Sequence, residues 1–479
     1  MTFRCKGIAV AAIAAAALGA GSVSASAADV VSIPVSFPVK NVNTSAAPCQ
    51  SDGKPYALHA ELVGPRDVLT GDAPATATLY LHEYSFDDFW HFRTVPGVDY
   101  ATALAEQGHV SVTLDRLGYD DSPRPDGTGI CLGAHADMAH QIVGQLRSGA
   151  YSAEGIGARS FQRVVLGGHS VGAIVAELEA YSFKDVDALM LFGHSDGDYS
   201  PKVVEVGAKQ GFTCGQGGDG GDVPNYAFFG TPEESRELAY KDTDPAVIEA
   251  QKALRHPDPC GDVNSLIPTI TSNKNRAGEI AVPILLLYGR DDATLAADAG
   301  DQQSQAYTAS KDVSTVWFDN ASHALTLERI APQVQATAAK WLSERRFGGR
   351  AAGTGAGGGG GGAGGGGTGG GPAQGGGTNP GGGGAARSGA LGIRLRGVRR
   401  RGCVRRSFRL RVRIATPGTR IRRVRLTLDG RRLKSGGRRS FSRRIAVGRL
   451  RPGLHRVVVT ARDDRGNRAR AAATFRRCG

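Results

Sequence analysis

The sequence GHSVG at residues 168–172 has the residue types and spacing of a serine nucleophile held on a sharp turn. It follows an apolar stretch and precedes a helix-forming run. Small residues two positions before and after a serine let a strand and a helix approach closely, and the turn between them exposes the hydroxyl. An ordinary glycine-rich turn is the alternative, but the strand–turn–helix context disfavours it. The pattern therefore predicts that Ser170 is a nucleophile.

A serine hydroxyl attacks poorly unless a histidine, oriented by a carboxylate, takes its proton. Both groups follow apolar stretches downstream, Asp291 and Asp292 in one turn and His323 in a later one. The two aspartates compete, because a one-residue shift in the turn would exchange them. Asp196, which follows a third apolar stretch, is a more distant rival. The chain order serine, acid, histidine thus predicts a catalytic triad.

The elements that must position these residues alternate between strand and helix. This alternation predicts a doubly wound, mainly parallel sheet covered on both faces, and the more polar first strands suit an antiparallel edge. Between about residues 193 and 282 the alternation lapses over a length too great for a plain loop, which predicts a lid insertion. Strands are expected at 57–63, 77–81, 110–114, 164–166, 188–192, 284–288 and 313–318, and helices at 134–147, 173–181, 324–344 and, in the lid, 232–241 and 246–255.

These motifs make residues 29–347 resemble the α/β-hydrolase superfamily, near its lipase, esterase and haloperoxidase-like branches. The strand-G-x-x-D motif of that family falls on Gly289 and Asp292, and its last-strand histidine falls on His323. The resemblance therefore implies an α/β-hydrolase fold, with Asp292 as the acid of the triad and His323 as its base. Asp291 and Asp196 stay as alternative acids. No cofactor is implied.

The resemblance also implies two backbone N–H groups that hold the oxyanion of a tetrahedral intermediate. One belongs to Val171, the residue after the nucleophile. The other comes from the loop after residues 77–81, which reads His82-Glu83-Tyr84, and we assign it to Tyr84 with Glu83 as the alternative. The family usually has glycine where this chain has Glu83, so this loop is the main departure from the pattern.

The N-terminus has the features of an export signal over residues 1–28. Arg4 and Lys6 form a short positive segment, an apolar run follows at 8–20, and small residues come next, as at a cleavage site. The run is too short to span a membrane, and no other stretch approaches the roughly 20 apolar residues that spanning requires. We therefore expect a secreted protein, extracellular or associated with the cell envelope.

Seven cysteines occur, and Cys5 lies in the expected signal. The other six are even in number, which in an oxidising compartment predicts disulfides, although six cysteines allow many connectivities and free buried thiols are the alternative. No clustered cysteine and histidine spacing predicts a metal site. The favoured pairs are Cys49–Cys131, Cys214–Cys260 in the lid, and Cys403–Cys478 in the tail.

Charge divides the chain sharply. The total is +13, but residues 387–479 hold 31 lysines and arginines against three acids, a net +28, which leaves −15 for the rest. A glycine-rich stretch at 348–389 separates the two parts, and its composition predicts a flexible linker. Such asymmetry indicates separate modules.

Residues 390–479 alternate apolar and arginine side chains between frequent turn signals. This alternation predicts a small all-β sandwich, and the pattern resembles immunoglobulin-like (Ig-like) modules of exported bacterial proteins. A surface this positive is expected to attract anionic cell-envelope polymers, and a coding bias toward arginine without any ligand is the alternative. Neither a recognition helix nor an aromatic platform is present to predict specific nucleic-acid binding.

The resemblance implies a serine hydrolase that acts on a small-molecule or lipid ester through an acyl-serine intermediate. The triad does not select among ester, peptide, lactone and peracid chemistry. Two alternatives stand beside this expectation. One is a catalytically silent binding protein on the hydrolase fold, and the other is an envelope-attached, adhesin-like protein whose main role lies in the basic tail.

Overall fold

A computed structural model of the chain describes residues 28–86, 89–197, 199–220, 223–252, 254–348, 392–396, 403–415, 420–429, 431–436, 439–463 and 468–478. They form two compact units. The first holds the chain as far as Asp244 and again from Arg255 to Gly353, and the second holds Pro245–Leu254 and the chain from Thr354 onward. The expected export signal and glycine-rich linker lie almost entirely outside the described residues, so both stay predictions.

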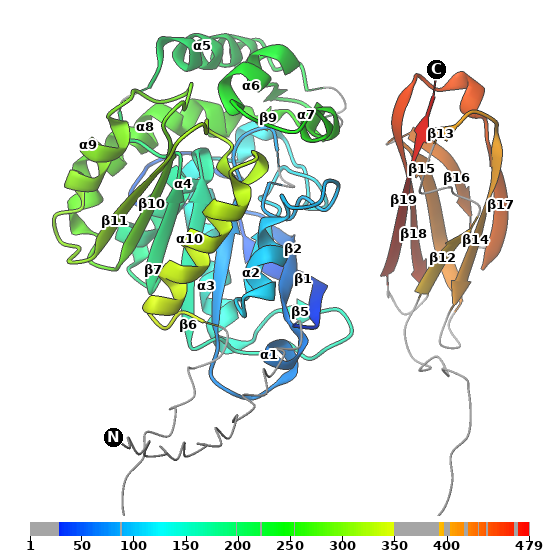
Figure 1. Cartoon of the computed structure of the whole chain (residues 1–479), viewed down its shortest axis with the longest axis horizontal. Coiled ribbons are helices and arrows are strands. Elements are labelled where there is room, and N and C mark those ends of the chain that lie inside the picture. Colours follow the sequence, from blue (N-terminus) through cyan, green and yellow to red (C-terminus); the bar gives the residue numbers. More distant parts are fainter. Residues whose placement is uncertain are drawn as a thin grey trace, which may run out of the picture. The chain divides into compact units, whose positions relative to one another are not determined.

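The first unit is built on one large sheet (Figure 1). Its strands lie in the order β11-β10-β7-β6-β3-β4-β2-β1-β5. Those from β11 to β4 are parallel to one another, whereas β2, β1 and β5 pair antiparallel at one edge. The expected mainly parallel sheet with an antiparallel edge is confirmed. The strands are β1 (Val30–Lys40), β2 (Pro55–Pro65), β3 (Thr76–Leu81), β4 (Ser111–Leu114), β5 (Ser152–Ala153), β6 (Arg163–His169), β7 (Ala188–Phe192), β10 (Ile284–Gly289) and β11 (Val313–Phe318).

Helices cover both faces of this sheet (Figure 1). On one face α3 packs against α4, and on the other α10 packs against α2. The central strands β3, β6, β7 and β10 are almost wholly buried, as continuous apolar strands in a parallel sheet should be. The helices are α1 (Arg66–Thr70), α2 (Tyr100–Glu106), η1 (Gly127–Gly129), α3 (Leu132–Ser148), α4 (Val171–Phe183), α9 (Ala299–Ala306), η3 (Leu325–Leu327) and α10 (Ala331–Glu344).

The insertion between β7 and β10 holds more helix than the sequence predicts. Helices α6 and α7 stand where two were expected, and α5 and α8 were not foreseen. Local signals fix α6, because Thr231 and Glu234 form a capping box around Pro232 at its first turn. Helix α8 packs against α3 and α4, so this part of the insertion belongs to the core. The elements are α5 (Pro201–Gly215), β8 (Tyr226–Ala227), α6 (Pro232–Ala239), α7 (Pro245–Lys252), β9 (Asp258–Pro259), α8 (Cys260–Arg276) and η2 (Ala277–Glu279).

Two disulfides join distant parts of the first unit, and both pairs are those predicted. Cys49 is bonded to Cys131, at the start of α3. Cys214, at the end of α5, is bonded to Cys260, at the start of α8. The side chain of Cys403 lies outside the described residues, so its bridge to Cys478 stays a prediction. The backbone register pairs Cys403 with Arg476, two residues from Cys478.

The second unit contains two small sheets, ordered β12-β14-β17 and β13-β19-β18-β15-β16. Side chains from both sheets, among them Leu410, Val412, Leu426, Val457 and Phe475, form one buried cluster. The part of the unit from Gly392 onward is thus a small all-β sandwich, and its likeness to immunoglobulin modules stays a prediction. Its elements are β12 (Gly392–Arg396), β13 (Cys403–Val404), β14 (Phe408–Ala415), β15 (Ile421–Leu428), β16 (Arg431–Gly436), β17 (Ser440–Ile445), η4 (Val447–Arg449), β18 (Gly453–Asp463) and β19 (Arg468–Arg477).

Within the described part of the chain, none of the helices has the length and apolar character that crossing a bilayer requires.

Candidate active site

Ser170 stands on the turn between β6 and α4 with φ 53° and ψ −118°, a strained backbone for a residue with a side chain. Glycines on either side permit the turn. A Cβ on Gly168 would lie 2.3 Å from the carbonyl oxygen of Gly172, and one on Gly172 would lie 2.3 Å from that of Leu81. The strand, the helix and the end of β3 therefore meet at Ser170 as the sequence predicts, and its side chain is only half-buried.

His323 and Asp292 form a hydrogen-bonded pair after β11 and β10. Nδ1 of His323 lies 2.8 Å from Oδ2 of Asp292, and both side chains are almost fully buried. Thr294 completes the group, since its hydroxyl donates to Asp292 Oδ1 at 2.7 Å and lies 2.8 Å from His323 Nδ1. These bonds occupy Nδ1 of His323 and leave Nε2 as the nitrogen that can take a proton from a nucleophile.

The charges of Asp292 and His323 shift the pKa values of both side chains. Burial acts to raise the pKa of Asp292, but the charge of His323 and hydrogen bonds from His323 and Thr294 outweigh it, so the pKa lies below 3.8. Burial acts to lower the pKa of His323, yet the charge and hydrogen bond of Asp292 bring it above 6.5. The pair therefore holds a carboxylate beside an imidazole that readily becomes imidazolium, which is what a general base requires.

The two competing acids lie elsewhere. Asp291 pairs with Lys241 at 3.2 Å and leaves 38% of its side chain exposed, whereas Asp292 leaves 5%. Asp196 accepts a hydrogen bond from Gln303 at 2.8 Å in a separate buried group with Glu177. Burial raises the pKa of Asp196 to about 7 and that of Glu177 to about 8. The structure therefore brings Asp292, and neither rival, to His323.

His169 ties the serine turn to the loop that carries His323. Its Nε2 lies 2.9 Å from the carbonyl oxygen of His323, and because a carbonyl only accepts, Nε2 holds the proton. The ring of Phe89 stacks on that of His169 at 4.1 Å. Next to this contact, a Cβ on Gly193 would come within 2.9 Å of the His323 ring, and Ser170 N–H donates to the carbonyl of Phe192. Residues 169–170, 192–193 and 323 therefore form one packed group.

Glu83 reaches into this group from the loop after β3. Glu83, His169 and His323 each place a ligand-type atom within 4.8 Å of the others. Because Nε2 of His169 holds its proton, Nδ1 presents a lone pair, and Glu83 Oε2 lies 3.4 Å from it. A protonated carboxyl suits that lone pair better than a carboxylate, and burial raises the pKa of Glu83 to about 7.

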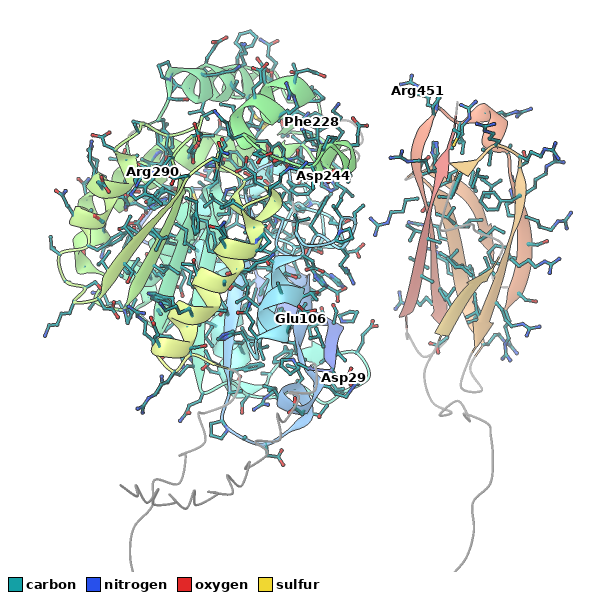
Figure 2. The ribbon with its side chains drawn as sticks, in the orientation of Figure 1. Asp29, Glu106, Phe228, Asp244, Arg290 and Arg451 are labelled. Carbon is teal, nitrogen blue, oxygen red and sulfur yellow. A yellow bond between two sulfur atoms is a disulfide. The ribbon has the colours of Figure 1, made fainter. Side chains whose placement is uncertain are left out.

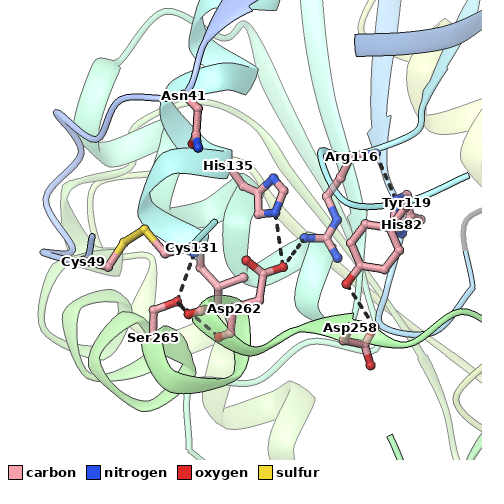
Figure 3. Close-up of polar contacts among 12 residues, drawn as sticks. Asn41, Cys49, His82, Arg116, Tyr119, Cys131, His135, Asp258, Asp262 and Ser265 are labelled. Carbon is pink, nitrogen blue, oxygen red and sulfur yellow. Dashed lines mark hydrogen bonds and ion pairs between the residues drawn. A yellow bond between two sulfur atoms is a disulfide. The ribbon is translucent and has the colours of Figure 1, made fainter. Parts of the chain in front are cut away.

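A buried polar network holds this loop in place (Figure 3). The backbone N–H of Arg116 donates to His82 Nε2 at 3.1 Å, so His82 Nδ1–H donates to the carbonyl of Glu83 at 2.7 Å. The Arg116 guanidinium donates to the same carbonyl and forms a buried ion pair with Asp262, which also contacts His135. Asp262 lies in α8, so the inserted segment fixes the backbone of the loop.

Asp258 of β9 holds the next residues of the same loop. Its carboxylate accepts the backbone N–H of Ser85 at 2.6 Å and the hydroxyl of Tyr119 at 2.9 Å. Tyr84 thus lies between two anchored residues, Glu83 and Ser85. Val171 begins α4, where backbone N–H groups have no partner inside the helix. Both N–H groups predicted for an oxyanion hole belong to fixed segments that meet at Ser170, and their roles stay proposals.

Three groups of carboxylates and histidines in the described residues have the spacing of metal ligands. In each one a histidine nitrogen already contacts a carboxylate: His169 with Glu83, His194 with Glu177 at 2.5 Å, and His140 with Asp185 at 2.7 Å. The contacts of the second and third groups are hydrogen bonds that need no ion.

Sequence reasoning missed three side chains of this site. Thr294 follows Asp292 by two residues, a spacing at which a hydroxyl can bond a carboxylate, but that signal is weak. His169 lies inside the GHSVG sequence and was not distinguished from its variable second position. Glu83 stands out in the sequence as a departure from glycine, but no local signal places its side chain in the site.

The family model for the alpha/beta hydrolase family matches residues 73–337, more than half of the chain. The chain therefore belongs to the α/β-hydrolase family. None of the curated proteins matches the sequence.

Several solved structures resemble this chain at low sequence identity. An esterase from Thermogutta terrifontis, with malate bound, is 19% identical over 64% of this chain and 98% of its own, with a TM-score of 0.43. A monoacylglycerol lipase of Paleococcus ferrophilus is 16% identical over 57% and 97%, also at 0.43. A soluble variant of the monoglyceride lipase of Saccharomyces cerevisiae is 13% identical over 63% and 95%, at 0.44. Likenesses of this size do not bear on the substrate of this chain.

Proposed function

We propose that the chain is an exported serine hydrolase that cleaves carboxylic esters through an acyl-serine on Ser170. One observation carries the proposal. Ser170 stands with a positive φ on the β6–α4 turn, and its neighbour His169 is hydrogen-bonded to His323, which Asp292 holds. A strained, half-exposed serine whose neighbouring residue is bonded to the histidine of a histidine–aspartate pair suits the geometry that acyl transfer needs.

The reaction proceeds in two halves. The Oγ of Ser170 attacks the acyl carbon of the ester while its proton passes to Nε2 of His323, and the alcohol then leaves with that proton. Water next attacks the acyl-serine, gives its proton to the same nitrogen, and the proton returns to Ser170 as the acid departs. Asp292 and Thr294 keep the proton on Nδ1 of His323 throughout, so that Nε2 alone changes its state.

Negative charge develops on the carbonyl oxygen in each half of the reaction. The backbone N–H groups of Val171 and Tyr84 receive it, because preorganised donors stabilise an oxyanion without reorganisation at the moment of reaction. The bonds that Arg116 and Asp258 make to the Tyr84 loop supply this preorganisation. Two disulfides in the catalytic unit support an oxidising compartment and thus export.

The decisive experiment replaces Ser170 with alanine and follows hydrolysis of p-nitrophenyl esters with acyl chains of increasing length. The expected result is a loss of kcat of roughly 10⁴-fold or more. Ser195→Ala is the matched control, since Ser195, like Ser170, follows a histidine in sequence, but that histidine belongs to a group separate from His323. It should hydrolyse the same esters at nearly the wild-type rate.

The result also separates the alternatives. Equal turnover by wild-type protein and Ser170→Ala would remove Ser170 from the reaction. An absence of turnover in both, across esters, lactones and peptides, would favour a silent binding protein. The acyl chain length at which kcat/KM is highest defines the substrate class.

A further inference from the structure

The outer face of the three-stranded sheet in the second unit carries a row of arginines. The side chains of Leu410 and Val412 on β14 are buried in the sandwich, so Arg409, Arg411 and Arg413 point away from it, and all three are exposed. In the antiparallel pairing of β14 and β17, Arg409 lies directly opposite Arg444. We call Arg409, Arg411, Arg413 and Arg444 the arginine face.

Like charges directly opposite each other destabilise a pair of strands. Neighbouring strands lie about 4.8 Å apart, well within the distance over which physiological salt screens charge. The second sheet repeats the arrangement, because Arg423 on β15 lies opposite Arg462 on β18 and both are exposed. A surface selected only for solubility mixes acidic and basic side chains. Arginines placed directly opposite each other therefore indicate a surface that binds a negatively charged ligand.

Acidic residues of the same unit do not neutralise the arginine face. Among the described residues from Gly392 onward, which form the sandwich, the acids are Asp429 and Asp463. Asp429 is bonded to the ring of His455 and to the backbone N–H of Arg456, and Asp463 is buried. The side chains drawn around the sandwich in Figure 2 end mainly in nitrogen and point outward.

The chemistry of the face identifies the ligand class. Guanidinium groups bind phosphate with two parallel hydrogen bonds, and four of them on one rigid surface suit a chain of repeated phosphates. Recognition of bases needs either aromatic platforms or an element that enters a groove. Among the described residues from Gly392 onward the aromatic side chains are buried or half-buried, and the helical element is the short η4.

We propose that the arginine face binds a phosphate-bearing polymer of the cell envelope and so attaches the enzyme to that polymer. Exposed arginine pairs on the outer faces of both sheets suit a mesh of flexible anionic chains, which meets several sides of the sandwich at once. A rigid duplex would meet one side. The binding is electrostatic, so it weakens steeply as salt is added.

The test uses the full chain and immobilised teichoic acid, a polyol phosphate polymer, over a series of salt concentrations. One variant carries Arg409→Gln, Arg411→Gln, Arg413→Gln and Arg444→Gln together. The matched control replaces four arginines of the catalytic unit whose side chains are similarly exposed. These are Arg66, Arg93, Arg290 and Arg329, so both variants lose the same net charge. Ester hydrolysis and the thermal transition of each variant confirm that the chain is folded.

Wild-type protein and the control should bind with similar affinity, and the variant of the arginine face about 10-fold or more weakly near physiological salt. Its log–log salt slope should fall by roughly three to four, about one for each phosphate that the variant no longer neutralises. Competition by soluble polyphosphate, but only weakly by heparin, would show that phosphate is the group recognised.

Several results would overturn the proposal. Equal weakening of both variants would show a response to net charge alone. Preference for double-stranded DNA over teichoic acid would make the ligand a nucleic acid. Binding that first rises as salt is added would show that the acidic catalytic unit of the same chain occupies the face.

Discussion

Glu83 offers the sharpest test of how this site controls protonation. Its carboxyl, the neutral ring of His169 and the base His323 lie within 4.8 Å of one another. Burial raises the pKa of Glu83 to about 7, while the nearby charge of His323 opposes that rise and those of Asp258 and Asp292 add to it. Because an ionised Glu83 attracts a proton on His323, the change Glu83→Gln should lower the pKa of the base.

Coulomb's law sets the size of this effect. At 4.8 Å, the upper limit of the separation, two unit charges interact by about 0.9 kcal/mol in bulk water and about 3.5 kcal/mol at an effective dielectric constant of 20. These energies correspond to roughly 0.6 and 2.5 pH units. The acid limb of the profile of kcat/KM against pH should therefore reach its midpoint that much lower in Glu83→Gln than in the wild-type enzyme.

The height of the profile should change together with its midpoint. His323 becomes imidazolium in the transition state, so an ionised Glu83 stabilises that state as well as the resting imidazolium. On the acid limb the two effects cancel, and the wild-type and variant rates should coincide. On the plateau only the transition-state effect remains. In the variant, kcat/KM should therefore reach its plateau at a lower pH, and the plateau value should be lower. The decrease in log(kcat/KM) on the plateau should equal the shift of the midpoint in pH units.

The assay is kcat/KM for a short p-nitrophenyl ester, corrected for spontaneous hydrolysis, from pH 5 to pH 9. Glu179→Gln is the control, because burial also raises the pKa of Glu179, on α4, yet its charge is not among those that act on His323. That control should keep the wild-type midpoint. A lower plateau in Glu83→Gln with an unmoved midpoint would refute the reasoning, since Glu83 would then act through the shape of the Tyr84 loop alone.

Three further predictions concern the site and its support. Asp292→Asn should lower kcat by roughly 10⁴-fold in steady-state assays, whereas Asp291→Asn should stay near the wild-type rate; the reverse result would exchange the two acids. Gly193→Ala places a Cβ 2.9 Å from the His323 ring and should lower kcat about 10²-fold. Gly155 also has a left-handed backbone, but it faces open space, so Gly155→Ala should lower stability and leave kcat unchanged. A similar kcat in these two alanine variants would refute contact with His323 as the cause. Burial raises the pKa of Glu177 from 4.5 to about 8, so between these pH values the folded state holds a proton that the unfolded state has lost. The free energy of unfolding should therefore fall as pH rises through this range. Denaturant titrations should show that the free energy of unfolding depends less on pH in Glu177→Gln than in the wild-type protein.

The local parts of the site could be predicted from the sequence because short-range sterics determine them. The turn at Ser170 needs small residues at fixed offsets, and those offsets are visible in the letters GHSVG. The parallel strands are continuous apolar runs, which made most of them visible as well. Strand β1 was missed because Pro34 and Pro38 argue against a strand, although its buried and less buried side chains alternate regularly through both prolines.

The remaining parts depend on contacts between distant segments. Helix α8 contains Pro268 and many polar residues, so its propensity gives little signal, and packing against α3 and α4 stabilises it instead. The choice between Asp291 and Asp292 depends on the way the turn after β10 faces the loop after β11. Glu83 is 86 residues from His169 by their numbers and still more distant from His323, and no local rule joins them.

The difference between local signals and contacts of distant segments also applies to the arginines of the tail. Alternation along β14 predicts that Arg409 and Arg411 point outward, but it does not say what faces them across the sheet. The pairing with β17 sets Arg409 against Arg444 and Arg411 against Ser442. Because the observed register keeps the charges together, the affinity of this face for phosphate depends on a strand pairing as well as on the number of arginines.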